Sequence, residues 1–340
     1  MNKRRSKVDE NKLRELFKKG YTYKQIGDFF GVSHWCIYKH CQRLGLKRGS
    51  GKRRGVPIEV FESEVATEEF LKAFREIKAL QEKCTTKLDE ITLNVDPDIK
   101  YIMLCFFADL HLGHLGVDYD LLKEYIKILE ETENAYVVFL GDVVDADVYP
   151  NWRSYENLPE QLVWKFFESL MIRLRGKIVA VCRGNHEYRL QKLVGVDLAE
   201  IILSRLGIPY LSFGGDIRVK AGDITYLIHV IHKTRYRSVI NPVHACIRLA
   251  HLRTDADIIV HAHYHEPSLA QINIRNKQRV LMTVGTFLTE SDYAHSIGLT
   301  PSTQRMNFRM PCVILNCKRK EMQGYLDLEL ARSLLNKLND

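Results

Sequence analysis

Apolar positions near the start of the chain recur at helical spacing. Between residues 9 and 46 they fall at positions 13, 16, 17, 26, 29, 30, 37 and 44, a pattern typical of amphipathic helices. Glycines stand at positions 20, 31 and 45, where such helices would end, and Ser33 is a suitable N-cap for the last one. The pattern predicts three short helices in the order of a helix-turn-helix.

From residue 101 onward, short apolar segments alternate with amphipathic ones. We predict helices at Leu121 to Glu131 and Leu162 to Leu174, and strands at Tyr101 to Ala108, Tyr136 to Leu140, Lys177 to Val181, Ile217 to Lys220, Ile224 to Ile231, Ile258 to Val260, Arg279 to Val284 and Cys312 to Cys317. Such alternation is typical of an α/β fold.

A third pattern lies between these two regions. Residues 49 to 55 are rich in Gly, Lys and Arg and predict a basic linker. Beyond Thr67, positions 70, 74, 77, 81, 84, 88 and 91 alternate in steps of four and three, which fits a coiled-coil seam and a homodimer through residues 70–91. A helix packed on the following domain explains the spacing as well, and we favour it. The predicted domains are therefore 1–48, a linker and helix at 49–98, and 99–340.

Composition narrows the class of protein. The 340 residues are 46% hydrophobic and 27% charged, which fits a globular chain. No apolar run approaches the roughly 20 residues of a membrane span, and the basic start has no apolar stretch behind it, so we expect neither a signal peptide nor membrane association. The eight cysteines form no CxxC pair. They indicate reduced thiols and a cytoplasmic location, which is the host cytoplasm if the protein is phage-encoded.

The positive charge is concentrated at one end. Residues 1 to 56 hold 16 Lys and Arg against 4 Asp and Glu, a net of +12, which leaves −4 for the rest of a chain whose total is +8. Together with the helical pattern, this segment resembles the DNA-binding helix-turn-helix of resolvases and of small phage or bacterial regulators. The resemblance implies contacts to nucleic acid, with DNA as the expected partner, from His34, Trp35, Tyr38, Lys39, Gln42, Arg43, Lys47 and Arg48. A small helical adaptor with a solvated basic face is the alternative.

Residue types that bind metals follow the ends of five predicted strands. They are Asp109-Leu110-His111, Gly141-Asp142-Val143-Val144-Asp145, Gly184-Asn185-His186-Glu187, the pair His229 and His232, and His261-Ala262-His263-Tyr264-His265. Each motif alone is more often a capped turn or a surface histidine. Their number and order, at the strand ends where α/β sites are usually built, favour one metal site.

In this order the motifs resemble the calcineurin-like metallophosphoesterase superfamily, in particular its DNA-repair nucleases. The resemblance implies a four-layer α/β/β/α sandwich and two divalent metal ions. Mn²⁺ is the expected metal, and Fe, Zn²⁺ and Ni²⁺ are alternatives. It implies that Asp109, His111 and His265 hold one ion, that Asn185, His232 and His263 hold the other, and that Asp142 bridges both.

The resemblance also implies catalytic roles. A hydroxide that bridges the metals would attack phosphorus, and His186 would protonate the leaving group. Asp145 would orient a ligand or a water. Arg183 would either neutralise the phosphate or pair with Glu187.

The sequence departs from the family pattern in several places. Ala262 and Lys233 stand where glycines are usual, so His229 stays an alternative to His232, and we interpret His261 as structural. Tyr264 replaces a small residue and would face the substrate. We interpret His114 as a loop residue near the substrate, and residues 285–301 as a wall of the cleft.

The motifs favour a phosphodiester as the substrate. Asp145-Ala146-Asp147 lacks the Arg-Gly that follows this Asp in protein phosphatases, and His186 suits a poor alkoxide leaving group. With the basic N-terminal segment, the sequence predicts a nuclease that acts on DNA or RNA. One alternative is a phosphodiesterase or phosphatase for a small nucleotide, located on DNA by the helix-turn-helix. The other is a DNA-binding regulator without turnover.

Overall fold

The computed structural model describes residues 8–46, 67–84, 88–146, 158–238, 240–289 and 310–340. The chain divides into two compact units, Met1–Gln81 and Glu82–Asp340. Each is described by itself below. The predicted linker at 49–55 and the predicted contacts at Lys47 and Arg48 lie outside the described residues, and the predicted domain boundaries stay predictions.

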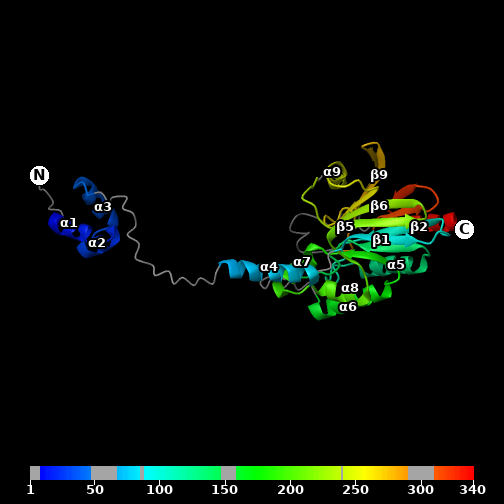
Figure 1. Ribbon diagram of the computed structural model, residues 1–340, viewed down its shortest axis with the longest axis horizontal. Coiled ribbons are helices and arrows are strands. Elements are labelled where there is room, and N and C mark those ends of the chain that lie inside the picture. Colours follow the sequence, from blue (N-terminus) through cyan, green and yellow to red (C-terminus); the bar gives the residue numbers. More distant parts are fainter. Residues whose placement is uncertain (1–7, 47–66, 85–87, 147–157, 239, 290–309) are drawn as a thin grey trace. The chain divides into compact units, whose positions relative to one another are not determined.

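The N-terminal unit contains the three helices that its apolar pattern predicts: α1 (Glu10–Lys18), α2 (Tyr23–Phe30) and α3 (His34–Arg43) (Figure 1). The three helices share one small core. Leu13, Ile26 and Ile37, one from each helix, are fully buried in it. A Cβ at Gly27 would lie 2.7 Å from the carbonyl oxygen of Val32, so only glycine lets α2 approach the turn before α3 this closely.

Helix α4 spans Thr67–Cys84, and its apolar side chains Leu71, Ile77 and Leu80 are exposed. The helix ends at Cys84, before the last two positions of the predicted seam, 88 and 91. Leu88 and Ile91 instead lie on β1 (Leu88–Val95), which pairs in parallel with β5 (Tyr210–Ala221). The prediction of one continuous helical seam to residue 91 is therefore wrong, because the strand hydrogen bonds claim that end of the segment. The homodimer stays a prediction.

A single mixed sheet organises the second unit. Its order is β11-β10-β2-β3-β4-β5-β6-β7-β9-β8, with β1 attached to β5. The strands not yet bounded are β2 (Tyr101–Phe107), β3 (Ala135–Phe139), β4 (Ile178–Cys182), β6 (Ile224–Ile231), β7 (Ile258–His261), β8 (Ser268–Ile274), β9 (Lys277–Thr283), β10 (Cys312–Asn316) and β11 (Met322–Tyr325).

The sheet folds back on itself, so that its two ends meet. A Cβ at Gly324 of β11 would lie 2.5 Å from a methyl carbon of Leu269 on β8, and β11 contacts both β8 and β9. One large apolar core runs through the space that the folded sheet encloses, from Met103 on β2 to Val260 on β7.

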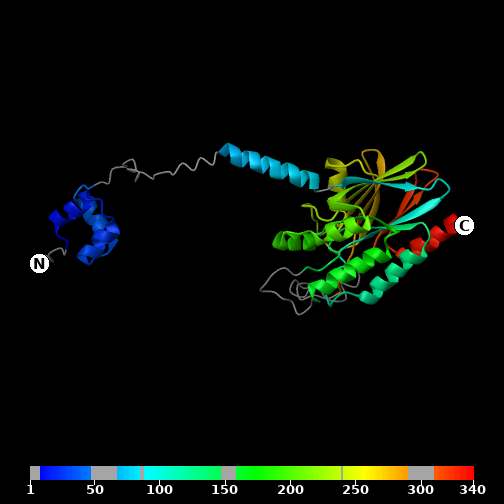
Figure 2. The ribbon, with the colours of Figure 1, turned by 60° about the horizontal axis from the view of Figure 1, so that its bottom comes forward.

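Helices cover the outer faces of the folded sheet. They are α5 (Tyr119–Glu131), α6 (Glu160–Arg173), α7 (Asn185–Val194), α8 (Leu198–Leu206), α9 (His244–Leu252) and α12 (Leu328–Asn339). Figure 2 shows α5, α6 and α12 together on one side of the sheet. Helix α9 packs on β7 and β9 through a second core that includes Cys246 and Ile259.

This layering confirms the α/β fold class and is consistent with the predicted sandwich. Among the helices that the structure describes, none has both the length and the apolarity that crossing a bilayer requires.

Candidate metal centre

The ends of five strands converge because β5 joins the two halves of the sheet. β2, β3 and β4 run parallel, and β5 begins in parallel beside the end of β4, where Val181 pairs with Tyr210. β6 then returns antiparallel to β5, with β7 parallel to it. The backbone N–H of His232, after β6, donates to the carbonyl of Phe213 on β5 at 2.9 Å. The loops after β2, β3, β4, β6 and β7 therefore meet at one edge.

The first cluster of donor atoms comprises Asp109, His111 and His265, whose ligand atoms all lie within 4.8 Å of one another. The Nε2 atoms of His111 and His265 are 3.2 Å apart. Asp109 is fully buried, and its Oδ1 has no hydrogen-bond partner among the described residues. A cation between these atoms would satisfy that buried oxygen, since burying an unpaired carboxylate oxygen is costly.

A second cluster comprises Asp142, His232 and His263, again within 4.8 Å. Nε2 of His232 lies 3.1 Å from Oδ1 of Asn185 and 3.3 Å from Oδ2 of Asp142. The opposite ring nitrogen, Nδ1, donates to the carbonyl of Leu140 at 2.7 Å. That bond fixes the ring so that Nε2 faces the other donors, which is how metal-binding histidines are usually oriented.

Asp142 links the two clusters. It belongs to the second, and it also forms a group with His111 and His186 whose donor atoms lie within 4.8 Å. Carboxylate, imidazole and amide donors in two adjoining sets fit two divalent cations of the transition-metal type. The structure thus brings all seven predicted ligands together.

The electrostatics of these groups suit cation binding. Burial by itself would raise the pKa of Asp142, but His232 and His186 outweigh it and hold that pKa well below its ordinary value. Burial, reinforced by the charge of His232, lowers the pKa of His263 to about 3. An ionised carboxylate and a neutral imidazole are the forms that ligate metals.

Backbone strain is concentrated on the same residues. Five of the seven predicted ligands have positive φ angles, which non-glycine residues rarely adopt: Asp109 at 49°, His111 at 49°, Asp142 at 48°, His263 at 80° and His265 at 59°. Such strain persists where the surrounding structure enforces it, and it gathers at functional sites.

Sequence reasoning missed the role of Glu187. Its carboxylate is buried and accepts backbone N–H groups from Asp142, Val143, Val144 and Gly184 at 2.7 to 3.1 Å. A Cβ at Gly184 would lie 2.1 Å from the backbone nitrogen of Asp142, so the two loops touch directly. The spacing of Glu187 three residues after Gly184 is that of a capping box, and it was the available signal.

Arg183 is engaged within the protein rather than with Glu187. Its guanidinium lies 3.2 Å from Asp197, donates to Ser212 at 3.1 Å and also bonds Gln191. The ring of Phe213 lies 4.5 Å from it. Its predicted role at the phosphate stays a prediction.

His229, His261 and His114 belong to none of these donor clusters. Nδ1 of His229 is 2.7 Å from Asp216 on the neighbouring strand, and His232, not His229, joins the ligand group. His261 is buried against the Tyr264 ring at 5.2 Å. His114 is buried and accepts the backbone N–H of Gly116 at 2.9 Å. Residues 290–301 of the predicted cleft wall lie outside the described part of the chain.

The predicted nucleic-acid contacts on α3 are mostly exposed. His34, Lys39 and Gln42 are exposed, and Trp35 is 60% exposed with its ring centre 5.0 Å from that of Tyr38. Arg43 is exposed as well, and it is paired with Glu10 at 2.5 Å.

Comparison with known proteins defines the class. Residues 102–267 match the family model described as calcineurin-like phosphoesterase. This span contains every ligand of the two clusters. That segment is a calcineurin-like phosphoesterase domain, and the protein is a metal-dependent phosphoesterase. No curated protein sequence matches the chain.

Solved structures resemble the chain only distantly. The calcineurin-like phosphoesterase YfkN from Bacillus subtilis is 11% identical over 71% of this chain and 100% of that one, with a TM-score of 0.39. A putative 5'-nucleotidase from Staphylococcus aureus is 14% identical over 70% of this chain and 58% of that one, at 0.37. Vacuolar protein sorting 29 from Cryptosporidium parvum is 12% identical over 67% and 100%, also at 0.37. Likenesses at this level carry no argument about function.

Proposed function

We propose that the protein is a nuclease: a two-metal phosphodiesterase that hydrolyses DNA, or RNA, while its N-terminal unit holds the nucleic acid. The position of His186 beside the two clusters carries this proposal. Its backbone N–H donates to Oδ1 of Asp142 at 2.8 Å, and its ring Nδ1 lies 2.8 Å from Oδ1 of Asp145. The contact with Asp145 is at ion-pair distance, although the ring is not aligned for a hydrogen bond.

In the metal-free protein, the charge around His186 favours its protonated form. Burial by itself lowers the pKa of the imidazole, but the carboxylates of Asp142 and Asp145 outweigh burial and raise that pKa to about 9. The side chain is 20% exposed, so a substrate can reach it. A partly exposed imidazolium at a phosphoesterase site is suited to act as a general acid.

The reaction follows from these positions. A water molecule loses a proton to solvent as its oxygen forms a bond to phosphorus, and the bond between phosphorus and the leaving ester oxygen breaks. The proton of His186 passes to that leaving oxygen, while Asp145 stabilises the imidazolium until transfer. Two divalent ions, Mn²⁺ in our proposal, would be held by the seven ligands and would lower the pKa of water and polarise the phosphoryl oxygen.

The N-terminal unit supports a polynucleotide as the substrate. A local net charge of +12 in residues 1 to 56 favours phosphate backbones through counterion release. The exposed Trp35 and Lys39 on α3 give the unit both an aromatic and a cationic contact.

The seven cysteines for which the structure describes side chains are free thiols, which fits a reducing cytoplasm.

A metal screen tests the proposal. The full chain, freed of metal and reloaded with Mn²⁺, Ni²⁺, Zn²⁺ or Mg²⁺, is assayed on labelled single-stranded DNA, duplex DNA, RNA and bis-p-nitrophenyl phosphate. Polynucleotide cleavage that His186→Ala loses supports a nuclease and identifies its substrate. Turnover of only the small ester favours a nucleotide phosphodiesterase located on DNA. Polynucleotide binding without any turnover favours a regulator.

A further inference from the structure

We propose that a basic track beside the metal centre binds the phosphodiester backbone on one side of the scissile phosphate. The track comprises five exposed cations. Three lie in the loop after β6, one on α9 and one at the C-terminal end of α9: Lys233, Arg235, Arg237, Arg248 and Arg253. The proposal rests on the proposed nuclease function and assigns part of its substrate-binding surface.

The cations of the track have no carboxylate partner among the residues that the structure describes. Some other surface arginines are paired with carboxylates, as Arg173 is with Glu130 at 2.5 Å and Arg218 with Glu90 at 2.7 Å. Across the described residues, no ion pair involves any of the five track cations. Since these side chains keep their full charge at the surface, they attract polyanions.

Aromatic rings hold three of the guanidinium groups in place. Those of Arg248 and Arg235 lie 4.9 and 5.2 Å from the ring centre of Tyr236. That of Arg237 lies 4.9 Å from the ring centre of Tyr264. A ring orients a guanidinium without cancelling its charge, so the N–H groups at its edge remain available to phosphate oxygens.

The behaviour of Tyr236 agrees with this concentration of charge. Its pKa is lowered, first by the hydrogen bond from Arg235 and then by the charges of Arg235, Arg248 and Arg253. One acidic side chain, Glu266, lines the same pocket as Tyr236 and Arg237. Within the described part of the chain it forms no ion pair with either arginine of the loop.

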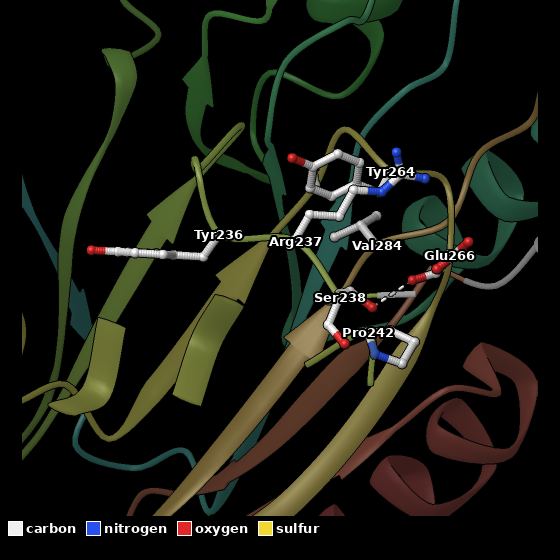
Figure 3. Close-up of a pocket in the computed structure, with 9 residues that line it drawn as sticks. Tyr236, Arg237, Ser238, Pro242, Tyr264, Glu266 and Val284 are labelled. Carbon is white, nitrogen blue, oxygen red and sulfur yellow. Dashed lines mark hydrogen bonds between the residues drawn. The ribbon is translucent and has the colours of Figure 1, made fainter. Parts of the chain in front are cut away.

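The track starts at the ligands themselves. Lys233 directly follows His232, and Tyr264 stands between His263 and His265 in the chain. The Tyr264 hydroxyl donates to the carbonyl of Thr234 at 3.2 Å, which ties the track loop to the ligand loop. Figure 3 shows the Arg237 side chain alongside the Tyr264 ring, while Tyr236 points away from it. A strand whose phosphate lies at the metals would thus meet Arg237 before Arg235 and Arg248.

The occupant that fits is a phosphodiester backbone rather than an isolated phosphate. Several unpaired guanidiniums in succession leading away from a phosphoesterase centre match the repeated charges of a polynucleotide. A small diester carries a single phosphate and therefore needs no succession of cations. The track should therefore matter for long substrates and much less for small ones.

The test uses the full chain carrying Arg235→Ala and Arg248→Ala together, with Arg319→Ala as the control. Arg319 is 72% exposed and follows β10, at the end of the sheet where Asn316 pairs with Tyr101 at the start of β2. It is therefore remote from the ligands, which follow the other end of β2. Values of kcat/KM are measured on a short and a long single-stranded oligonucleotide and on bis-p-nitrophenyl phosphate, over a range of salt concentrations.

We expect the double variant to lose about tenfold or more in kcat/KM on the long oligonucleotide, beyond any change on the small ester. We also expect the slope of log(kcat/KM) against log salt to fall by about 2, one unit for each phosphate contact removed. Arg319→Ala should keep the kcat/KM and the salt slope of the original protein. An oligonucleotide rate and salt slope equal to the original protein's would overturn the track and leave the nuclease function standing. If the original protein cleaves no polynucleotide with any metal, the nuclease function fails, and the track fails with it.

Discussion

The Glu187 carboxylate accepts the backbone N–H of Val143 at 2.7 Å. Three further N–H groups converge on the same side chain, and they come from both the loop after β3 and the loop after β4. One acidic residue outside the predicted ligand set therefore sets the spacing between Asp142, in the loop after β3, and Asn185, at the start of α7 after β4. The geometry of the centre depends on it.

Glu187→Gln should destabilise the protein and weaken metal binding. The amide keeps one oxygen acceptor but turns an NH₂ group toward backbone donors, which leaves buried N–H groups unsatisfied. We expect the free energy of unfolding to fall by about 2 to 4 kcal/mol, measured by urea denaturation of the metal-free protein. The exposed Glu329→Gln, with its side chain 64% exposed, is the matched control. Equal stability of the two variants would refute this role.

Asp142→Asn should abolish hydrolysis without unfolding the chain. Asp142 is 1% exposed and is the carboxylate shared by the donor groups, so its charge is needed to hold two cations close together. We expect kcat/KM for bis-p-nitrophenyl phosphate to fall by about a thousandfold or more, and bound Mn²⁺ per chain to fall in elemental analysis. The control is Asp223→Asn, in the exposed turn between β5 and β6, which should keep the original kcat/KM and the original Mn²⁺ content. Unchanged turnover would remove Asp142 from the centre.

The sequence predicted which donor residues cluster better than it predicted what supports them. Strand ends followed by Asp, Asn and His are local signals, and the clusters at Asp109 and His232 match them. The ends of β4 and β6 meet at one edge because β5 pairs with both strands. This pairing joins residues far apart in the chain, so no local sequence pattern predicts it.

The same limit explains the missed supporting contacts. Arg183 stands beside the motif in sequence, but its partners Asp197 and Ser212 come from later segments. The seam predicted through Ile91 failed for a related reason, since pairing with β5 overrode a helical spacing.

Metal binding should release protons near neutral pH. Burial by itself lowers the pKa of His232, but Asp142 and Asp109 outweigh it and raise that pKa to about 9. The metal-free protein therefore holds a proton on His232 at pH 7, and that proton must leave before Nε2 can ligate. Titration calorimetry with Mn²⁺ in HEPES and in Tris should show about one or two protons released per chain at pH 7.

The same linkage sets the pH window. The number of protons released on metal binding should decline as the pH rises through about 9. Metal affinity should increase as the pH rises toward this value, because fewer protons compete with the metal for His232. His232→Gln should release fewer protons at pH 7 than the original chain. Identical heats in the two buffers at pH 7 would contradict the assignment.

His186→Ala should discriminate between substrates by their leaving groups. A general acid helps most when the leaving oxygen is a poor alkoxide and least when it is a p-nitrophenolate. We expect kcat on an oligonucleotide to fall by about a hundredfold or more, with a much smaller fall on bis-p-nitrophenyl phosphate. The buried Asp145 stands 2.8 Å from this imidazole and also 3.0 Å from Nδ1 of the proposed ligand His111, so Asp145→Asn should lower the turnover of both substrates. An equal loss on both substrates in His186→Ala would make His186 a structural residue instead.

The N-terminal unit should bind DNA through α3 rather than through its charge as a whole. Lys39 on α3 and Lys18 on α1 are both exposed lysines of the same unit. If α3 faces the nucleic acid, Lys39→Ala should raise Kd several-fold and lower the salt slope by about 1, whereas Lys18→Ala should change neither. Fluorescence anisotropy with labelled duplex DNA measures both, and bis-p-nitrophenyl phosphate turnover should stay the same in the two variants. Equal weakening by both lysine variants would favour a diffuse basic surface, and no weakening by either would favour the adaptor alternative.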